Sequence, residues 1–410
     1  MYDIIIIGGG ISGLNTALNL SKNKKVLLCE KNNNFGGRIY TDRFSINKDK
    51  YSLDAGAGRI SKSHKQMINL IKKMNLYNKL VEIDAEIDFY PSNNYSLKNK
   101  FNNITGYDLI DKVIKQSKTI SKEKLINMTF EELSSLFLKK EELKFMLDSC
   151  GYYGDLKIQN AYTALDVFKK SIRTDKKYFI MNGGFSQLID KMIEFIKKQH
   201  TCLTNTYCKE LYYNDEIFTL NINNKRFLCK QLVLAIPKEN LLEFSFLRPY
   251  FPLLKSIYCV PLMRIYSIYR PEDVWFHDIR KTTTNNYLKY IIPIDPEKGV
   301  IMTSYTDHTY ADYWKKNSNN KKKLDKLLKD NIKNVFHKYT KTPLDIKSYY
   351  WPCGVGLWKA GYNTDKIIKE IIHPNKKIPL FIIGENYSKY QGWMEGALDT
   401  SNKCISKLNI

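Results

Sequence analysis

The beginning of the chain carries the pattern that most restricts its fold: a short apolar run, a glycine-rich turn, a helix and a second apolar run. The first run covers residues 2–7, the helical pattern residues 14–21 and the second run residues 26–30. Continuous apolar runs of this length are typical of buried strands. A strand–helix–strand unit of about thirty residues implies parallel pairing and a right-handed crossover. We therefore expect a Rossmann-like α/β domain here.

The turn after the first run, residues 8–13 (GGGISG), fits the pattern GxGxxG. Gly8 permits the tight turn, Gly10 lets a diphosphate approach the backbone, and Gly13 lets the helix pack closely on the strand. Free N–H groups at the helix start then face the negative charge. Glu30 ends the second strand, where its carboxylate can accept hydrogen bonds from a ribose diol. These features predict a dinucleotide site; a plain glycine turn is the alternative.

A second glycine pair with an arginine, Gly36-Gly37-Arg38, follows the ribose acid. Such a loop can pass under a diphosphate and contribute a cation to it. This spacing favours FAD over NAD as the dinucleotide. The alternative for Arg38, taken alone, is a surface arginine.

Length and pattern together predict two domains. A chain of 410 residues is too long for one ordinary core. Residues 64–173 are mainly helical in pattern, and strand-like segments follow between residues 211 and 305. Because these blocks alternate with segments that resemble the opening unit, both domains should be discontinuous. An FAD-binding domain would combine residues 1–62, 176–240 and 345–410, and a substrate-binding domain residues 63–175 and 241–344.

The formal net charge of +23 comes almost entirely from lysine, since only nine of the 65 basic residues are arginines. The chain is also rich in Asn, Ile and Tyr, and an AT-rich coding sequence produces that joint bias. We interpret the charge mainly as compositional drift and do not expect nucleic acid as a partner. A binding partner with an anionic surface is the alternative.

Cysteine usage and hydropathy bear on the compartment. No run of about 18 apolar residues predicts a membrane span, and no basic leader precedes the first strand. The eight cysteines form no CxxC pair, and no histidine lies at ligand spacing, so we expect no zinc site. Scattered cysteines in a chain of this size are typical of reduced, mostly buried thiols. We therefore expect a cytoplasmic protein.

Taken together, these motifs resemble the flavin-containing amine oxidase superfamily, which includes monoamine oxidases, polyamine oxidases and L-amino-acid oxidases. The motifs occur in the family's order along nearly the whole chain. Near residues 80–170 and 275–345, only the general pattern of the sequence matches the family. The matching segments are residues 8–13, Glu30, Gly36-Gly37-Arg38, residues 53–59 (LDAGAGR), 182–185 (NGGF), 233–237 (VLAIP), 384–385 (GE) and 391–397 (QGWMEGA).

The resemblance implies an α/β FAD-binding domain of the glutathione-reductase type, an α+β substrate-binding domain, and an FAD between them. It also implies that the α-carbon of an amine passes a hydride to flavin N5, giving an imine that hydrolyses. The residues expected to hold the FAD are Gly8, Gly10, Ile11, Ser12, Gly13, Glu30, Lys31, Gly36, Gly37, Arg38, Gly56, Ala57, Gly58, Arg59, Cys208, Gly384, Glu385, Gly392, Trp393, Met394 and Ala397.

Several of these roles follow from the family's C-terminal motif. Glu385 matches an acidic residue near the flavin ribityl and diphosphate. Met394 begins the last helix and matches the position whose backbone N–H faces the flavin pyrimidine carbonyl, where the helix end would stabilise negative charge. Trp393 matches one wall of an aromatic cage for the amine, and Trp358 matches the other. A helix cap for Met394 and core packing for the two tryptophans are the alternatives.

Two departures from the family's pattern concern the flavin. Monoamine oxidases have a flavin-bonding cysteine where this chain has Leu357, so we predict a noncovalent FAD; Cys353 is close but out of register. The family places a lysine that assists oxygen reactivity at the position of Arg264. Arginine keeps the charge but does not deprotonate, which puts reoxidation by O2 in doubt. A surface position for Arg264 is the alternative.

Arg59 bears on the substrate. The segment Gly56-Ala57-Gly58-Arg59 resembles the one in which L-amino-acid oxidases place an arginine that binds the substrate carboxylate. A structural arginine bonding backbone carbonyls, or one contacting the flavin, is the alternative. We interpret His64 as a helix-start residue and not as a catalytic base.

The sequence therefore predicts an FAD-dependent oxidase of an amine or L-amino acid, in which Arg264, Trp393, Trp358 and Arg59 serve the reaction. A carboxylate-bearing amine is favoured over a polyamine, because a cationic surface repels a polycation. Two alternatives stay open. One is a flavin dehydrogenase or desaturase-like enzyme with an acceptor other than O2, and the other is a non-enzymatic flavoprotein that binds an anionic partner.

Overall fold

The computed structural model describes residues 1–410 except 85, 98–99, 102–103, 170–176 and 409–410. One half of the molecule is built around a seven-stranded sheet. Its strand order is β10-β11-β12-β1-β2-β9, and β18 pairs with β12. Its strands are β1 (Tyr2–Ile7), β2 (Val26–Cys29), β9 (Thr201–Leu203), β10 (Cys208–Asn214), β11 (Ile217–Ile222), β12 (Lys225–Leu234) and β18 (Leu380–Ile382).

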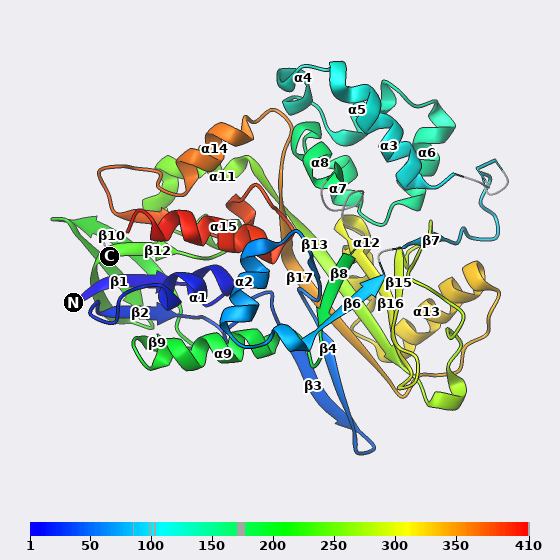
Figure 1. Ribbon diagram of the computed structural model, residues 1–410, viewed down its shortest axis with the longest axis horizontal. Coiled ribbons are helices and arrows are strands. Elements are labelled where there is room, and N and C mark those ends of the chain that lie inside the picture. Colours follow the sequence, from blue (N-terminus) through cyan, green and yellow to red (C-terminus); the bar gives the residue numbers. More distant parts are fainter. Residues whose placement is uncertain (85, 98–99, 102–103, 170–176, 409–410) are drawn as a thin grey trace.

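The opening unit of this sheet is as predicted. Strand β1 runs parallel to both β2 and β12, and β18 runs parallel to β12. Ile4, Ile5 and Ile6 are fully buried, because both faces of the sheet are covered. Helix α1 (Ile11–Leu18) crosses between β1 and β2 and packs against α9 (Ser186–Lys197) and α15 (Met394–Ile405) (Figure 1). These features confirm the Rossmann-like fold class.

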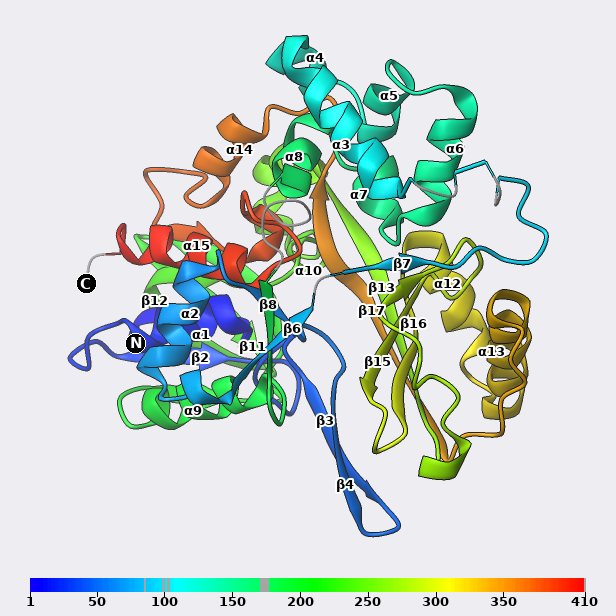
Figure 2. The same cartoon turned by 45° about the vertical axis from the view of Figure 1, so that its right-hand side comes forward.

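A second sheet of six strands lies beside the first, in the order β17-β13-β16-β15-β14-β7. Helices α12 (His308–Asn317) and α13 (Lys321–Phe336) cover one of its faces (Figure 2), where Trp314 packs among residues of β13 and β16. The hairpin of β3 (Thr41–Ile46) and β4 (Asp49–Asp54) packs against the other face. The strands of the second sheet are β7 (Asp88–Phe89), β13 (Ile257–Ile268), β14 (Thr282–Thr283), β15 (Tyr290–Asp295), β16 (Val300–Asp307) and β17 (Asp345–Trp358).

A block of short helices with its own apolar core sits at the top of both views (Figures 1 and 2). Capping boxes at Thr105 and Thr129 begin two of these helices. The helices are α3 (Gly106–Gln116), α4 (Lys122–Ile126), α5 (Phe130–Ser135), α6 (Lys140–Ser149), α7 (Tyr153–Lys157) and α8 (Ala161–Val167).

Two small sheets join these parts. The hairpin of β3 (Thr41–Ile46) and β4 (Asp49–Asp54) projects from the body of the molecule (Figure 2). A three-stranded sheet contains β5 (Ile60–Ser61), β8 (Lys177–Met181) and β6 (Leu80–Asp84). The remaining elements are helices α2 (Lys65–Lys73), α10 (Lys238–Leu241), α11 (Phe251–Lys255) and α14 (Thr364–Ile371), and 3-10 turns at Tyr77–Lys79, Ser117–Thr119, Ser245–Tyr250, Pro271–Asp273 and Glu385–Tyr387.

The domain boundaries stay a prediction. Strand β17 falls within the stretch 345–410 that we expected in the FAD-binding domain, yet it pairs along its length with β13 of the second sheet. Where the structure describes the chain, no helix combines the length and apolar composition needed to cross a membrane.

The expectation that the cysteines are all reduced is wrong for two of them. Cys259 of β13 and Cys353 of β17 form a disulfide across a sequence separation of 94 residues. The register between two distant strands brings them together, and spacing along the chain does not reveal such a pairing. The other six cysteines are free thiols. Cysteine usage therefore gives no support to a cytoplasmic location, which stays a prediction.

Candidate active site

The glycine-rich turn between β1 and α1 forms one end of a cavity of about 490 Å³. A Cβ added at Gly8, whose φ is +107°, would lie 2.4 Å from the carbonyl oxygen of Ala235, and one at Gly13 would lie 2.0 Å from that of Gly8. A Cβ at Gly10 would meet nothing within 4 Å, and Gly10 lines the cavity. Gly8 and Gly13 thus permit close packing, whereas Gly10 leaves open space on the cavity side.

Glu30 is anchored at the same end of the cavity. Its Oε2 accepts a hydrogen bond from the Gly9 N–H at 2.8 Å, and its Oε1 accepts from the backbone N–H and the side-chain amide of Asn32 at 2.9 and 2.8 Å. A carboxylate offers about four acceptor directions. These three bonds leave one acceptor direction unused, and Glu30 lines the cavity, which suits the predicted contact with a ribose hydroxyl.

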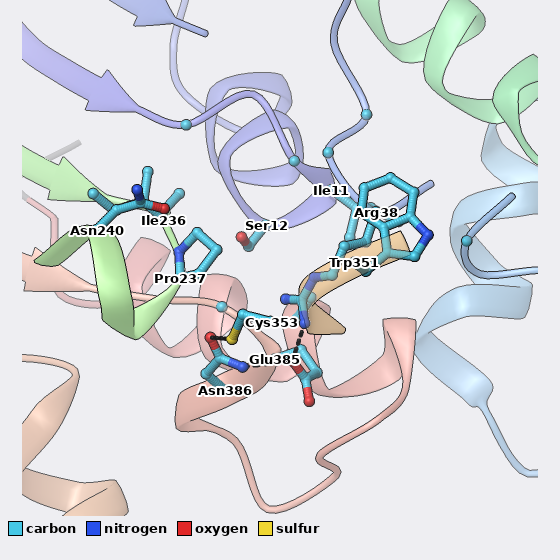
Figure 3. A pocket seen from close by; sticks show the side chains of 18 of the residues that line it. Ile11, Ser12, Arg38, Ile236, Pro237, Asn240, Trp351, Cys353, Glu385 and Asn386 are labelled. Carbon is cyan, nitrogen blue, oxygen red and sulfur yellow. Dashed lines mark hydrogen bonds and ion pairs between the residues drawn. The ribbon is translucent and has the colours of Figure 1, made fainter. Parts of the chain in front are cut away.

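An ion pair between Arg38 and Glu385 lies further along the cavity (Figure 3). The guanidinium Nη1 donates to Glu385 Oε2 at 2.6 Å and to the Gly354 carbonyl at 2.9 Å. Glu385 also accepts from the backbone N–H groups of Gly356 and Gly392, at 3.2 and 2.6 Å. Charge-assisted hydrogen bonds are the stronger kind. This pair therefore joins the second glycine loop, strand β17 and the segment that leads into α15.

Helix α15 begins at this cavity. Trp393 is its N-cap residue and Met394 its first residue, and no side chain caps its first N–H groups. Gly392, Trp393, Met394 and Ala397 all line the cavity. An uncapped helix start presents unsatisfied N–H groups and partial positive charge, so it stabilises an anionic group placed there.

Most residues predicted to hold FAD line this first cavity, and three do not. Gly13 packs α1 onto β1, and Gly58 and Arg59 line a second cavity. The residues that line the first cavity are Gly8, Gly10, Ile11, Ser12, Glu30, Lys31, Gly36, Gly37, Arg38, Gly56, Ala57, Cys208, Gly384, Glu385, Gly392, Trp393, Met394 and Ala397.

Sequence reasoning missed several residues of this cavity. Ile236 and Pro237 follow β12, which ends beside β1, and they line the cavity next to the glycine turn (Figure 3). Ligands of open α/β sheets bind outside the carboxyl ends of the strands, so their place after β12 could have indicated them. Trp351 and Cys353 also line the cavity. No local signal in the sequence points to them.

A second cavity of about 570 Å³ adjoins the first. Arg264 and Tyr305 line both cavities and mark the place where they meet. Arg59 and two further tyrosines, Tyr152 and Tyr290, complete this part of its wall. The hairpin strand β4 forms another side.

Arg59 lies among aromatic side chains. Its Nη2 donates to the Tyr152 hydroxyl at 2.7 Å, and its guanidinium carbon lies 4.7 Å from the ring centre of Tyr178 and 5.6 Å from that of Trp393. Cation–π contacts of this length are attractive. None of the carboxylates in the described part of the chain forms an ion pair with it.

Arg264 projects from β13 to the meeting point of the two cavities. Its Nη1 donates to the Asp54 carbonyl at 2.7 Å, and its guanidinium carbon lies 4.9 Å from the ring centre of Tyr305. Among the described residues it too forms no ion pair; the carboxyl of Asp54 accepts from Thr41 and Phe185, and burial raises its pKa. A Cβ on Gly58 would lie 3.1 Å from Arg264 Nη1, so Gly58 leaves room beside the guanidinium.

The predicted cage of Trp393 and Trp358 does not form. Trp358 is fully buried, its indole N–H donates to the Ser388 carbonyl at 3.0 Å, and it lines neither of the two cavities. Pairing with Ile257 at the end of β13 places Trp358 in the core instead. The tryptophan of β17 that reaches the first cavity is Trp351, whose indole N–H donates to the Ala55 carbonyl at 2.8 Å.

Two further residues from the sequence analysis, Leu357 and His64, lie outside the lining of both cavities. Leu357 is buried and lines neither cavity. His64 is the N-cap residue of α2, as expected for a helix start. Its ring packs edge-on against that of Trp393, with 4.7 Å between the ring centroids.

Comparisons with known proteins agree with this geometry. A family model described as flavin containing amine oxidoreductase matches residues 11–404. "Uncharacterized protein R188" of Acanthamoeba polyphaga mimivirus is 22% identical, over 99% of this chain and 93% of its own length. "Amine oxidase [flavin-containing] A" of Equus caballus is 23% identical, over 58% of this chain and only 50% of its own length.

Two solved structures share the fold. A double mutant of putrescine oxidase superposes with a TM-score of 0.77 at 13% identity, over 99% of this chain and 98% of that one. Cyclohexylamine oxidase from Brevibacterium oxydans IH-35A superposes with a TM-score of 0.75 at 15% identity, with the same coverage. The match to the family model spans nearly the whole chain, and the chain therefore belongs to the flavin-containing amine oxidoreductase family.

Proposed function

We propose that this protein is an FAD-dependent oxidoreductase that oxidises the CH–NH group of an amine carrying a carboxylate, with the FAD held noncovalently. The observation that carries this proposal is the pair of arginines in the second cavity. Arg59 and Arg264 line that cavity without a carboxylate partner among the described residues, and Arg264 also borders the first cavity.

The first cavity suits a dinucleotide. Its open floor at Gly10 fits a diphosphate, the remaining acceptor direction of Glu30 fits a ribose hydroxyl, and the uncapped start of α15 fits a group that gains negative charge. Its volume of about 490 Å³ lies within the usual range for ligand sites. Bound FAD would supply the redox chemistry by accepting the hydride from the carbon next to the amine.

The wall of the second cavity contains the carboxyl groups of Asp54, Glu86 and Asp295, but within the described part of the chain none of them forms an ion pair with Arg59 or Arg264. A substrate carboxylate would supply that partner. Taking a guanidinium out of water costs several kcal/mol unless an anion compensates for it. The fork of N–H groups in arginine matches a carboxylate with two parallel hydrogen bonds. Tyr152 holds one side of the Arg59 guanidinium, and the rings of Tyr178 and Trp393 restrict its position. Arg59 is thus pre-oriented to bind the substrate carboxylate near Trp393, which borders the first cavity.

Arg264 supports a second candidate for the acceptor. Its guanidinium stays protonated and is hydrogen-bonded to the Asp54 carbonyl. A fixed charge of this kind can stabilise an anion at the meeting point of the cavities, but it cannot take part in proton exchange there. An acceptor other than O2 is therefore the second candidate function. Mixing substrate-reduced protein with oxygen in a stopped-flow instrument separates the two, because an oxidase must reoxidise quickly.

The substrate class is tested by anaerobic bleaching of the flavin with matched pairs: L-phenylalanine against phenethylamine, and L-leucine against isoamylamine, with putrescine as a polycation. We expect the amino acid of each pair to reduce the flavin faster. Equal rates within the pairs would exclude a carboxylate-specific site. If no compound in an extended panel reduces the flavin, the enzymatic function itself loses its support.

The variant Arg59→Ala tests the carboxylate contact. Loss of one charged hydrogen-bond partner should lower kcat/KM for amino acids by about 10²-fold or more, while FAD stays bound. Arg43→Ala is the matched control, because Arg43 lies exposed on β3 and pairs with Asp190. Unchanged kcat/KM in Arg59→Ala would contradict the assignment.

A further inference from the structure

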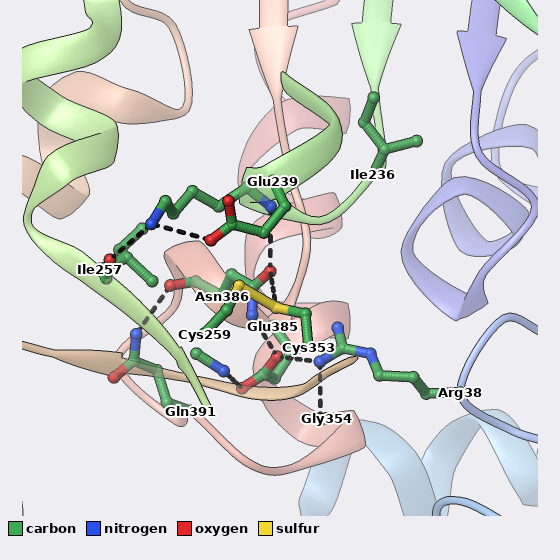
Figure 4. The surroundings of a disulfide bond; sticks show 12 residues. Arg38, Ile236, Glu239, Ile257, Cys259, Cys353, Gly354, Glu385, Asn386 and Gln391 are labelled. Carbon is green, nitrogen blue, oxygen red and sulfur yellow. Dashed lines mark hydrogen bonds and ion pairs between the residues drawn. A yellow bond between two sulfur atoms is a disulfide. The ribbon is translucent and has the colours of Figure 1, made fainter. Parts of the chain in front are cut away.

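The disulfide Cys259–Cys353 lies in the wall of the first cavity. Cys353 lines that cavity, and both cysteines are only partly buried. Figure 4 shows the disulfide beside the ion pair of Arg38 and Glu385, and Arg38 also donates to the carbonyl of Gly354, the residue after Cys353. The disulfide is therefore close to the groups that shape the cavity.

The strands that carry the two cysteines are not evenly paired here. Val260 pairs with Val355 and Leu262 with Trp351, so residues 352–354 of β17 face the single residue Pro261 of β13. This is a bulge in β17, and it contains Cys353. Residues 261 and 352 are both prolines, which have no N–H to donate. The ladder of backbone hydrogen bonds is thus interrupted where the chain borders the cavity.

Among the described residues, the bulge has two polar contacts besides the disulfide. The Gly354 carbonyl accepts from Arg38 at 2.9 Å, and Cys353 Sγ lies 3.9 Å from Asn386 Oδ1. Beside the bulge, the Trp351 indole donates to the Ala55 carbonyl at 2.8 Å. The disulfide is the covalent connection between the bulge and β13. The guanidinium of Arg38, which lines the cavity, is held by two acceptors, the Gly354 carbonyl and Glu385. A change in the bulge is therefore transmitted to Arg38 through one hydrogen bond.

We propose that Cys259–Cys353 is a redox switch for cofactor retention. The oxidised pair holds the bulge of β17 against β13 in the cavity wall, and reduction by a dithiol loosens the bulge and weakens FAD binding. This inference rests on the proposed function in one respect, that the first cavity holds FAD. In the reaction, a thiolate of the dithiol attacks one sulfur and the S–S bond breaks. The second thiol of the dithiol then attacks the dithiol's own sulfur in this mixed disulfide, and the bonded cysteine leaves as a thiolate. Two electrons and two protons pass to the cysteines, and the dithiol becomes a disulfide.

The first test uses the wild-type protein freed of FAD. One portion is left oxidised; the other is treated with dithiothreitol, which is then removed under nitrogen. Alkylation and mass spectrometry verify the state of Cys259 and Cys353. Titration with FAD should give a dissociation constant about tenfold higher for the reduced portion, the effect of losing one hydrogen bond to a charged group. Equal constants would overturn the switch, since a plain staple changes stability and not affinity. If neither portion binds FAD, the proposed function fails instead.

Variants provide the second test. Cys353→Ser should bind FAD with the weaker affinity and should not respond to dithiothreitol. Cys202→Ser removes a partly buried free thiol on β9 and should respond like the wild type. Circular dichroism checks that both variants are folded. Tight FAD binding by folded Cys353→Ser contradicts the proposal, as does alkylation of both Cys259 and Cys353 in the untreated protein.

Discussion

Two glycines of the first turn face different surroundings, and this difference can be tested at the scale of single residues. An added methyl group at Gly13 would lie 2.0 Å from the Gly8 carbonyl, whereas one at Gly10 would meet nothing within 4 Å. Gly13 is therefore required by the contact between α1 and β1. Gly10 borders the cavity and is required only when a ligand approaches.

We expect Gly13→Ala to lower the free energy of unfolding by about 1–3 kcal/mol, the usual cost of overpacking. Gly10→Ala should change it by no more than about 0.5 kcal/mol but should weaken FAD binding. Urea unfolding of the FAD-free proteins and titration with FAD measure the two effects. A Gly10→Ala variant that binds FAD like the wild type would mean that the diphosphate does not lie on this turn.

Two carboxyl groups, the half-buried Asp155 of α7 and the buried Asp307 at the end of β16, make stability depend on pH. Burial, followed by the charge of Asp307, raises the pKa of Asp155 from 3.8 to about 7. Burial also raises the pKa of Asp307 to about 6, although hydrogen bonds from the backbone N–H groups of Gly154 and Tyr153 act to lower that pKa. The folded protein thus binds more protons than the unfolded chain between about pH 4 and pH 7.

Stability should therefore fall as the pH rises through this window, because ionising a buried carboxyl costs about 1.4 kcal/mol per pKa unit. Asp155→Asn should make the free energy of unfolding less dependent on pH, with the largest gain over wild type at pH 8 and little gain at pH 4. Urea unfolding at several pH values measures this. Asp190→Asn, at an exposed position on α9, should keep the wild-type slope. An unchanged slope in Asp155→Asn would show that this carboxyl does not carry the effect.

At the scale of elements, one carboxylate joins helices α2 and α15. Glu395, in the first turn of α15, accepts hydrogen bonds from the backbone N–H groups of Gln66 and Met67 in the first turn of α2, at 3.0 and 2.9 Å. It thereby caps α2 from another element, because His64 at the N-cap provides no side-chain cap. The start of α15, which borders the first cavity, is fixed by the same contact.

Glu395→Ala should lower the free energy of unfolding by about 1–3 kcal/mol, because the buried N–H of Met67 and the partly buried N–H of Gln66 lose their acceptor. Asp399→Ala one turn later removes only a pair with Lys403 and should cost less than about 0.5 kcal/mol. Thermal and urea unfolding compare the two. Equal effects would mean that the link between α2 and α15 contributes little.

At the scale of the whole molecule, the first cavity is built from segments distributed along the chain: the opening turn, the second glycine loop, the end of β12, the bulge of β17 and the start of α15. A ligand that fills it binds only the folded arrangement of all of them. The cavity thus couples cofactor binding to the stability of the fold.

FAD at about 100 times its dissociation constant should therefore raise the free energy of unfolding by about 2.7 kcal/mol. Calorimetry with increasing FAD should show a concentration-dependent rise in Tm. NAD should give no comparable rise, because the second glycine loop and its arginine are features that favour FAD. A Tm that responds equally to both dinucleotides would contradict the assignment of the cofactor.

Local sequence by itself determined the glycine turn, the strand–helix–strand opening, the acid at Glu30, the Gly36-Gly37-Arg38 loop and the start of α15. Each depends on residues close together in the chain or on conformations that only glycine adopts. The register of β13 against β17 was decided by the tertiary structure alone. That register buries Trp358, exposes Trp351 to the cavity and joins Cys259 to Cys353. Side chains on a strand alternate between faces, so the bulge in β17, opposite Pro261 of the distant strand β13, changes which side chains of β17 reach the site.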